Sequence, residues 1–198
     1  MRYLSETNIK GLIGKLEKHG SLGYLERLSA ENRVHELRHV HGRQLLVALL
    51  EATHGIPLMD IIAQEYHSIH PAEAKLLYLD ICSLHRFGPP VRAGLISRIH
   101  NISFEDFRDK FFRPLEAIVV LKEDKCSGDY VYEARHSYIA HTLYETILRS
   151  QEERFDNIIR IVNKLNPSFS YDLEVIGDLV RADNLEKTLS DHAKIRQV

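Results

Sequence analysis

The residues best suited to chemistry in this sequence are its 12 histidines, because imidazole titrates near neutral pH, ligates metals and donates hydrogen bonds to anions. Three of them occur in the spacing Glu-x-x-His: Glu36 with His39, Glu51 with His54, and Glu133 with His136. On a helix this spacing aligns the two side chains, as di-iron carboxylate bundles require. Chance gives roughly one such pair at this composition, and the further inward glutamates of a di-iron site have no matched pattern here. We therefore expect no metal site.

A second group of histidines, His35, His39 and His41, is interleaved with arginines and makes a locally basic stretch. Its simplest interpretation is a solvated face, and the alternative is a contact to nucleotide or to a neighbouring domain. The two cysteines, Cys82 and Cys126, have neither metal-binding nor redox spacing and are expected to be plain thiols. None of these residues stands in a recognisable nucleophile motif.

Composition places the chain among ordinary globular proteins. Its 198 residues are 44% hydrophobic and 27% charged, with a formal net charge of -2, so no global basic field favours nucleic acid. The sequence contains no transmembrane stretch, and its first residues lack the basic and apolar regions of a secretion signal. We expect a cytoplasmic protein of two compact modules without a membrane partner.

The first part of the chain predicts a helical bundle over 1–69. Ile9, Leu12, Ile13 and Leu16 form one helical stripe that Thr7 or Asn8 could cap and Gly20 ends. A second amphipathic stretch follows 29–33, and 43–53 is a strongly helical run. Gly55 and Pro57 stop that run, and the apolar pattern restarts at Leu58, so that Pro57 stands in the first turn of a new helix.

The segment 70–150 predicts a winged helix-turn-helix module. His70-Pro71 opens a helix over 72–85, with Ala74, Leu77, Tyr78, Ile81 and Leu84 on its buried face. A short helix over 91–99 follows, and Ser103 with Asp106 forms a capping box for a third helix to about Phe112. Two β-rich runs, 117–121 and 129–133, then predict a two-stranded wing, followed by a helix over 136–150.

The remaining segment, 151–198, predicts further helices broken at Asn166-Pro167. The predicted fold class is therefore mainly α: a helical lid bundle, a winged helix-turn-helix with a two-stranded wing, and trailing helices. The final run has no terminating glycine or proline, which suggests a larger helical architecture beyond it.

This order of modules resembles the lid and winged-helix region of the STAND class of P-loop ATPases, which includes the NB-ARC and NACHT groups. That lid carries a Gly-x-Pro motif at the start of a helix, and Gly55-Ile56-Pro57-Leu58 stands in the matching place. The winged helix of the class ends with a histidine before an apolar helix, as Arg135-His136-Ser137 does here, although the plant motif has Met and Asp where Arg135 and Ser137 stand.

The resemblance implies a site for ADP or ATP. Pro57 of the Gly55 motif would pack against adenine, His136 would reach the β-phosphate of ADP, and Arg135 would add positive charge there. It also implies a regulatory segment that clamps ADP in a closed state and releases it for ATP-driven self-association, in signalling or defence. An imidazole at a helix N-terminus suits an anion, because exposed backbone N–H groups already favour one.

The catalytic parts of that class are missing from this sequence. Gly11-Leu12-Ile13-Gly14-Lys15-Leu16 fails as a P-loop, because its spacing is short and no hydroxyl residue follows the lysine to hold magnesium. The resemblance therefore implies partners in the same polypeptide, a P-loop ATPase domain upstream and helical repeats downstream, and a possible homo-oligomer of the whole protein. The chain by itself is not expected to be an enzyme.

Two alternatives remain. A winged helix could belong to a DNA-binding regulator, but the predicted reading helix balances Glu105, Asp106 and Asp109 against Arg108, Lys110 and Arg113, whereas phosphate contact needs a positive excess. The other alternative is a helical interaction scaffold that never binds nucleotide. It shares the predicted fold and differs only in the role of Pro57 and His136.

Overall fold

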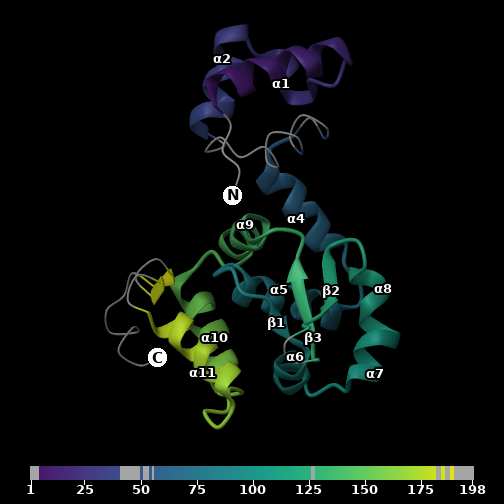
Figure 1. Ribbon diagram of the computed structural model, residues 1–198, viewed down its shortest axis with the longest axis vertical. Coiled ribbons are helices and arrows are strands. Elements are labelled where there is room, and N and C mark those ends of the chain that lie inside the picture. Colours follow the sequence, from purple (N-terminus) through teal and green to yellow (C-terminus); the bar gives the residue numbers. More distant parts are fainter. Residues whose placement is uncertain are drawn as a thin grey trace. The chain divides into compact units, whose positions relative to one another are not determined.

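The computed structural model describes residues 5–40, 50, 54, 56–125, 128–181, 184, 185, 188 and 189, and this part of the chain is mainly helical with a small antiparallel sheet (Figure 1). It divides into two compact units, residues 1–64 and 65–198. The segment from 151 onward belongs to the second unit. Apart from residue 50, the predicted helix over 43–53 lies outside the described residues, as do Gly55 and Cys126. In the described part, every helix is too short or too polar to cross a lipid bilayer.

The first unit is built from short helices. Its described elements are α1 (Glu6–Lys18), the 3₁₀-helix η1 (Gly23–Arg27), α2 (Ala30–His35), the π-helix η2 (Glu36–Val40) and the start of α4 (Leu58–Ser68). The residue that caps α1 is Ser5, whose hydroxyl accepts the N–H of Asn8 at 3.2 Å. The predicted caps Thr7 and Asn8 were therefore wrong, because the helix begins one residue before Thr7. After α1, Gly20 takes a φ of 59°, which favours glycine.

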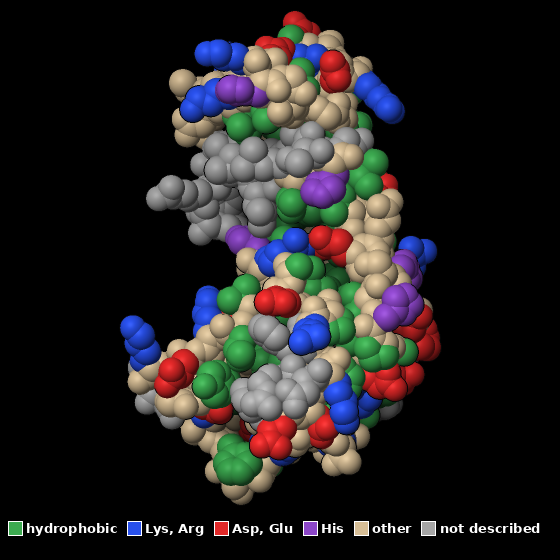
Figure 2. Space-filling view, turned by 90° about the vertical axis from the view of Figure 1, so that its right-hand side faces the viewer, with side chains coloured by type: hydrophobic (Ala, Val, Ile, Leu, Met, Phe, Trp, Pro, Cys, Tyr) green, Lys and Arg blue, Asp and Glu red, His purple; other side chains and the backbone are tan. Residues whose placement is uncertain are grey.

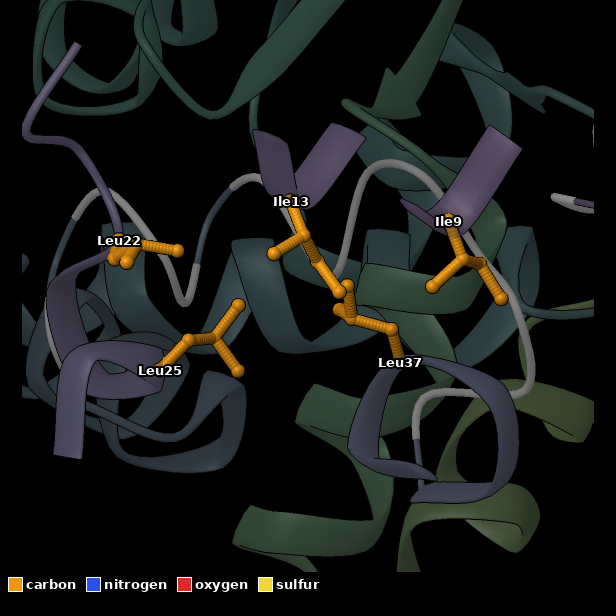
Figure 3. Close-up of a cluster of buried hydrophobic side chains, with 5 residues drawn as sticks. All are labelled: Ile9, Ile13, Leu22, Leu25 and Leu37. Atoms are coloured by element: carbon orange, nitrogen blue, oxygen red, sulfur yellow. The ribbon is translucent and has the colours of Figure 1, made fainter. Parts of the chain in front are cut away.

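An apolar cluster holds α1, η1, α2 and η2 of the first unit together. Figure 3 shows its five buried side chains converging: Ile9, Ile13, Leu22, Leu25 and Leu37. Ile9 and Ile13 belong to the predicted stripe of α1, and Leu12 and Leu16 pack at its margin. The predicted stripe is confirmed, and its side chains are those that α1 packs into the core.

The second unit contains the sheet. Its described elements are α5 (Ala72–His85), β1 (Val91–Arg92), α6 (Ala93–His100), α7 (Phe104–Asp106), the π-helix η3 (Phe107–Phe111), α8 (Phe112–Leu115), β2 (Val119–Glu123), β3 (Tyr130–Ala134), α9 (Ser137–Ile147), α10 (Gln151–Val162) and α11 (Ser170–Val180). Helix α5 has the predicted bounds, and all five residues of its predicted face are buried. It is the central helix of this unit and packs against α9 and β3.

The three strands run in the order β1-β3-β2, and both pairings are antiparallel. The predicted hairpin is confirmed: β2 pairs with β3 from Val119 opposite Ala134 to Glu123 opposite Tyr130. Its turn contains Gly128, whose φ of 67° suits a residue without a side chain. The prediction of a helix from residue 91 was wrong at its start, because Val91 and Arg92 pair with β3 before α6 begins.

The helix predicted after Ser103 forms, but it is not a regular α-helix. The Ser103 hydroxyl accepts the N–H of Asp106 at 3.0 Å, and the Asp106 carboxylate accepts from the backbone and hydroxyl of Ser103, so the predicted capping box is confirmed. A π-helical turn, η3, then separates α7 from α8. Phe107 in this turn packs on Tyr132 of β3, with ring centroids 4.3 Å apart. This contact ties the helix to the sheet.

In the view of Figure 1, α10 and α11 lie on the opposite side of the second unit from α7 and α8. Buried charges join them to the rest of the unit. Asp80 of α5 is fully buried and accepts two hydrogen bonds from Arg160 of α10, and Arg98 of α6 pairs with the buried Asp172 of α11. The hydroxyl of Tyr171 also donates to the carbonyl of Pro90 at 2.7 Å. These contacts explain why the segment after 150 belongs to the second unit.

Candidate functional site

The predicted lid motif sits at the start of α4. Pro57 immediately precedes this helix, and its carbonyl accepts the N–H groups of Asp60 and Ile61 at 3.0 and 3.1 Å. Its ring is exposed. Gly55 lies outside the described residues. Pro57 belongs to the first unit, whereas Arg135 and His136 belong to the second, so only the last two are placed with respect to each other.

His136 is the N-cap of α9, at the point where β3 gives way to the helix. Its Nδ1 accepts the N–H of Tyr138 at 3.0 Å, and its carbonyl accepts the N–H of Ala140 at 3.0 Å. Because Nδ1 supplies a lone pair to this bond, the hydrogen of the neutral ring is on Nε2. The ring is half-buried, and no described residue accepts from Nε2. His136 therefore presents an N–H donor beside the first turn of α9.

Arg135 is already engaged. Its guanidinium donates to the carboxylate of Glu65, with about one third of each side chain exposed (32% and 29%). The guanidinium also lies close enough to Tyr78 and Cys82 of α5 to oppose the effect of burial on their pKa values. To contact a phosphate, Arg135 would have to share its charge between the anion and Glu65.

His85 of α5 forms a cluster with Arg135 and His136 at the end of β3, and sequence reasoning missed it. Its Nδ1 accepts the N–H of Ala134 at 3.1 Å, so it fixes the end of β3 directly before Arg135 and His136. Burial lowers the pKa of His85, Glu133 raises it, and His136 and Lys122 lower it further. The signal was available: His85 follows Tyr78 by seven residues and therefore lies on the buried face of α5.

The cluster contains no activated nucleophile. Cys82 is fully buried, and desolvation raises the pKa of its thiol well above the ordinary value. Desolvation likewise raises the pKa of Tyr66 to about 12. Among the described residues, no three His, Cys, Asp or Glu side chains come together as a metal site. The arrangement can hold an anion by hydrogen bonds.

Comparisons of the chain with protein-family profiles, with curated proteins and with solved structures found no match.

Proposed function

We propose that this chain is the lid and winged-helix segment of a STAND-type nucleotide switch, in which His136 binds a phosphate of ADP and the Gly55–Pro57 motif contacts its base. Binding of ADP stabilises a closed state, and exchange for ATP releases it so that the whole protein self-associates. The ATPase core would be supplied by the same polypeptide outside this chain, as would helical repeats that sense the trigger.

The order of elements in the second unit supports the winged-helix part of the proposal. A helix, a short strand, two further helical segments and a hairpin follow one another from α5 to β3, and β1 adds to the free edge of β3. In a winged helix-turn-helix the hairpin is the wing, and here it leads directly to His136. His136 therefore follows the hairpin, as the motif histidine of the STAND class follows the wing.

The observation that carries the nucleotide role is the tautomer of His136. The bond from Tyr138 to Nδ1 fixes the ring and leaves Nε2–H as a donor. The ring sits at the N-terminus of α9, an 11-residue helix whose dipole favours negative charge at this end. A phosphate at this position would be bound by the Nε2–H of His136 and stabilised by the helix N-terminus, with Arg135 adjacent in the sequence.

DNA binding is the main alternative, and the charges of the second unit argue against it. Lys110 of η3 pairs with Asp106 at 2.7 Å, and Lys122 of the hairpin pairs with Glu133 at 2.6 Å. On the face shown in Figure 2, Lys and Arg side chains of the described residues are scattered among Asp and Glu side chains. Phosphate backbones need an excess of positive charge, which these pairs remove.

The proposal is tested by measuring ADP affinity in the polypeptide that includes the proposed P-loop domain. His136→Asn keeps an N-cap acceptor for Tyr138 but lacks the distal donor, so the fold is retained and ADP binds at least about tenfold more weakly. His136→Gln keeps a donor near the position of Nε2 and loses less affinity. Exposed His19, at the end of α1, provides the control His19→Ala, which leaves affinity unchanged.

The alternatives give different results in the same experiment. If His136 only caps α9, His136→Asn binds ADP as the wild type does. If Pro57→Ala also leaves ADP affinity and ATP-driven assembly unchanged, the nucleotide switch is wrong and the helical scaffold takes its place.

A further inference from the structure

Arg86 is a largely buried cation without a carboxylate partner among the described residues. It stands at the C-cap of α5, where its Nε–H donates to the carbonyl of Ser83 at 3.1 Å and one terminal N–H donates to the hydroxyl of Thr188 at 2.9 Å. Burial lowers the pKa of its guanidinium, although Tyr144 and Glu145 oppose the effect. Burying an unpaired charge is costly unless other groups stabilise it.

Two aromatic rings supply part of that stabilisation. The guanidinium carbon lies 3.6 Å from the ring centroid of Tyr144 and 4.4 Å from that of Phe87. Tyr144 is itself fully buried, and its hydroxyl has no hydrogen-bond partner in the described part of the chain. Glu145, whose charge acts on Arg86, is itself paired with Arg154 at 2.5 Å. The rings therefore hold Arg86 in place without neutralising it.

A pocket of about 360 Å³ opens beside this arginine. Its described lining residues come from the end of α5, from α9 and from the segment after α11: Arg86, Phe87, His141, Asn184 and Thr188. No carboxylate is among these described lining residues. By contrast, the pocket lined by Arg92 and Arg98 also contains Asp129 and Asp172, and Arg98 is paired with the latter. Counted over the described residues, the lining at Arg86 is net positive, whereas the lining at Arg92 and Arg98 is balanced.

We propose that the Arg86 pocket binds a small oxyanion, the phosphate or carboxylate group of a soluble metabolite. Nε and one terminal N–H of Arg86 are occupied, so three of the five guanidinium donors have no described acceptor and can bind the anion. The Asn184 amide and the Phe87 ring provide polar and flat apolar surface for the remainder of the ligand. This site is separate from His136 and does not depend on the nucleotide role.

The test is a titration of the chain with sodium phosphate, and separately with sodium acetate, with sodium chloride matching the ionic strength. Amide and side-chain NMR signals of Phe87, His141 and Asn184 are followed. Saturable chemical-shift changes are expected with phosphate, with acetate or with both. The anion that produces them shows whether the pocket binds a phosphate or a carboxylate group. Arg86→Gln is expected to weaken binding at least about tenfold. His141→Asp, an exposed substitution that adds a carboxylate to the lining, also weakens it.

Arg149 offers a matched control. It also follows the end of a helix and donates from Nε to the carbonyl three residues earlier, that of Thr146 at 3.0 Å, but it lines none of the pockets described here. Arg149→Gln and His136→Asn should both leave the titration unchanged. The proposal is overturned if neither anion gives saturable shifts, if Arg86→Gln and Arg149→Gln behave alike, or if His136→Asn abolishes the effect.

Discussion

The two units of this chain are stabilised differently. In the first, the buried side chains shown in Figure 3 are aliphatic, and the ion pairs that accompany them, such as Arg33 with Glu17 and Arg38 with Glu6, involve a carboxylate that is about half exposed. In the second, Asp80, Asp172 and His85 are buried among the hydrophobic side chains. The difference shows which side chains determine how the helices pack. In the second unit, the buried polar groups determine which helices meet, and they hold the end of β3 in place before His136.

Loss of the Asp80 carboxylate should have the largest effect. Asp80→Ala leaves Arg160 and the Asn157 amide without their acceptor and His100 without its neighbour at 2.8 Å, so the free energy of unfolding should fall by about 3–5 kcal/mol. Urea denaturation followed by circular dichroism measures it. Asp156→Ala, on the exposed side of α10, serves as the control and should change stability by less than about 0.5 kcal/mol. Equal effects would mean that the buried network is not a stabilising feature.

A cavity in the first unit should come next. Leu25 is 1% exposed, and Leu25→Ala should destabilise this unit by about 2–5 kcal/mol through lost burial and the space left behind. Hydrogen exchange resolves the effect by region: protection should fall over α1 and α2 and persist in α5. A uniform loss of protection across both units would contradict the separation of their cores.

The pH dependence of the second unit should reveal His85. Because burial lowers its pKa below the ordinary 6.5, the folded state binds fewer protons than the unfolded state. The stabilisation is therefore complete above about pH 6.5 and is lost as the pH falls through the folded-state pKa, with a slope of at most about 1.4 kcal/mol per pH unit. His85→Asn keeps an acceptor for Ala134 and should flatten this part of the curve. Identical curves for the two proteins would refute the assignment.

The smallest effect should come from a surface pair of the first unit. Glu17→Gln removes the charge that Arg33 contacts at 2.5 Å, but Glu17 is 48% exposed and Arg33 also donates to the carbonyl of Leu25. Exposed pairs contribute about 0–1 kcal/mol, and added salt weakens them. Thermal melts at low and high salt should differ by less for Glu17→Gln than for the wild type. A loss comparable with that of Leu25→Ala would overturn the contrast between the units.

The sequence was most informative where local signals agreed. Helix α5 was predicted with the correct bounds because His70-Pro71, an apolar period of 3.6 and Gly88-Pro89-Pro90 all point to the same limits. The hairpin was found because β-rich runs flank a turn with Gly128. Strand β1 was missed because a strand of two residues is too short to show an alternation of apolar and polar side chains. Val91 and Arg92 become a strand only because they pair with β3.

The candidate site was predictable in part. His136 was singled out by its motif, and the structure adds which ring nitrogen is available, something that only the bond from Tyr138 determines. The pairing of Arg135 with Glu65 joins residues 70 positions apart, and no pattern in the sequence indicates it. The same holds for Arg86, whose partners lie on α9 and near the C-terminal end.

The role of His136 in nucleotide binding is tested by its ring ¹⁵N spectrum, recorded with and without ADP in the polypeptide that includes the proposed P-loop domain. We expect the Nε2–H tautomer in the absence of ADP and a shift of the Nε2 resonance when ADP is added, while exposed His67 does not respond. A ring that carries its hydrogen on Nδ1, or an Nε2 signal that ADP leaves unchanged, would contradict that role.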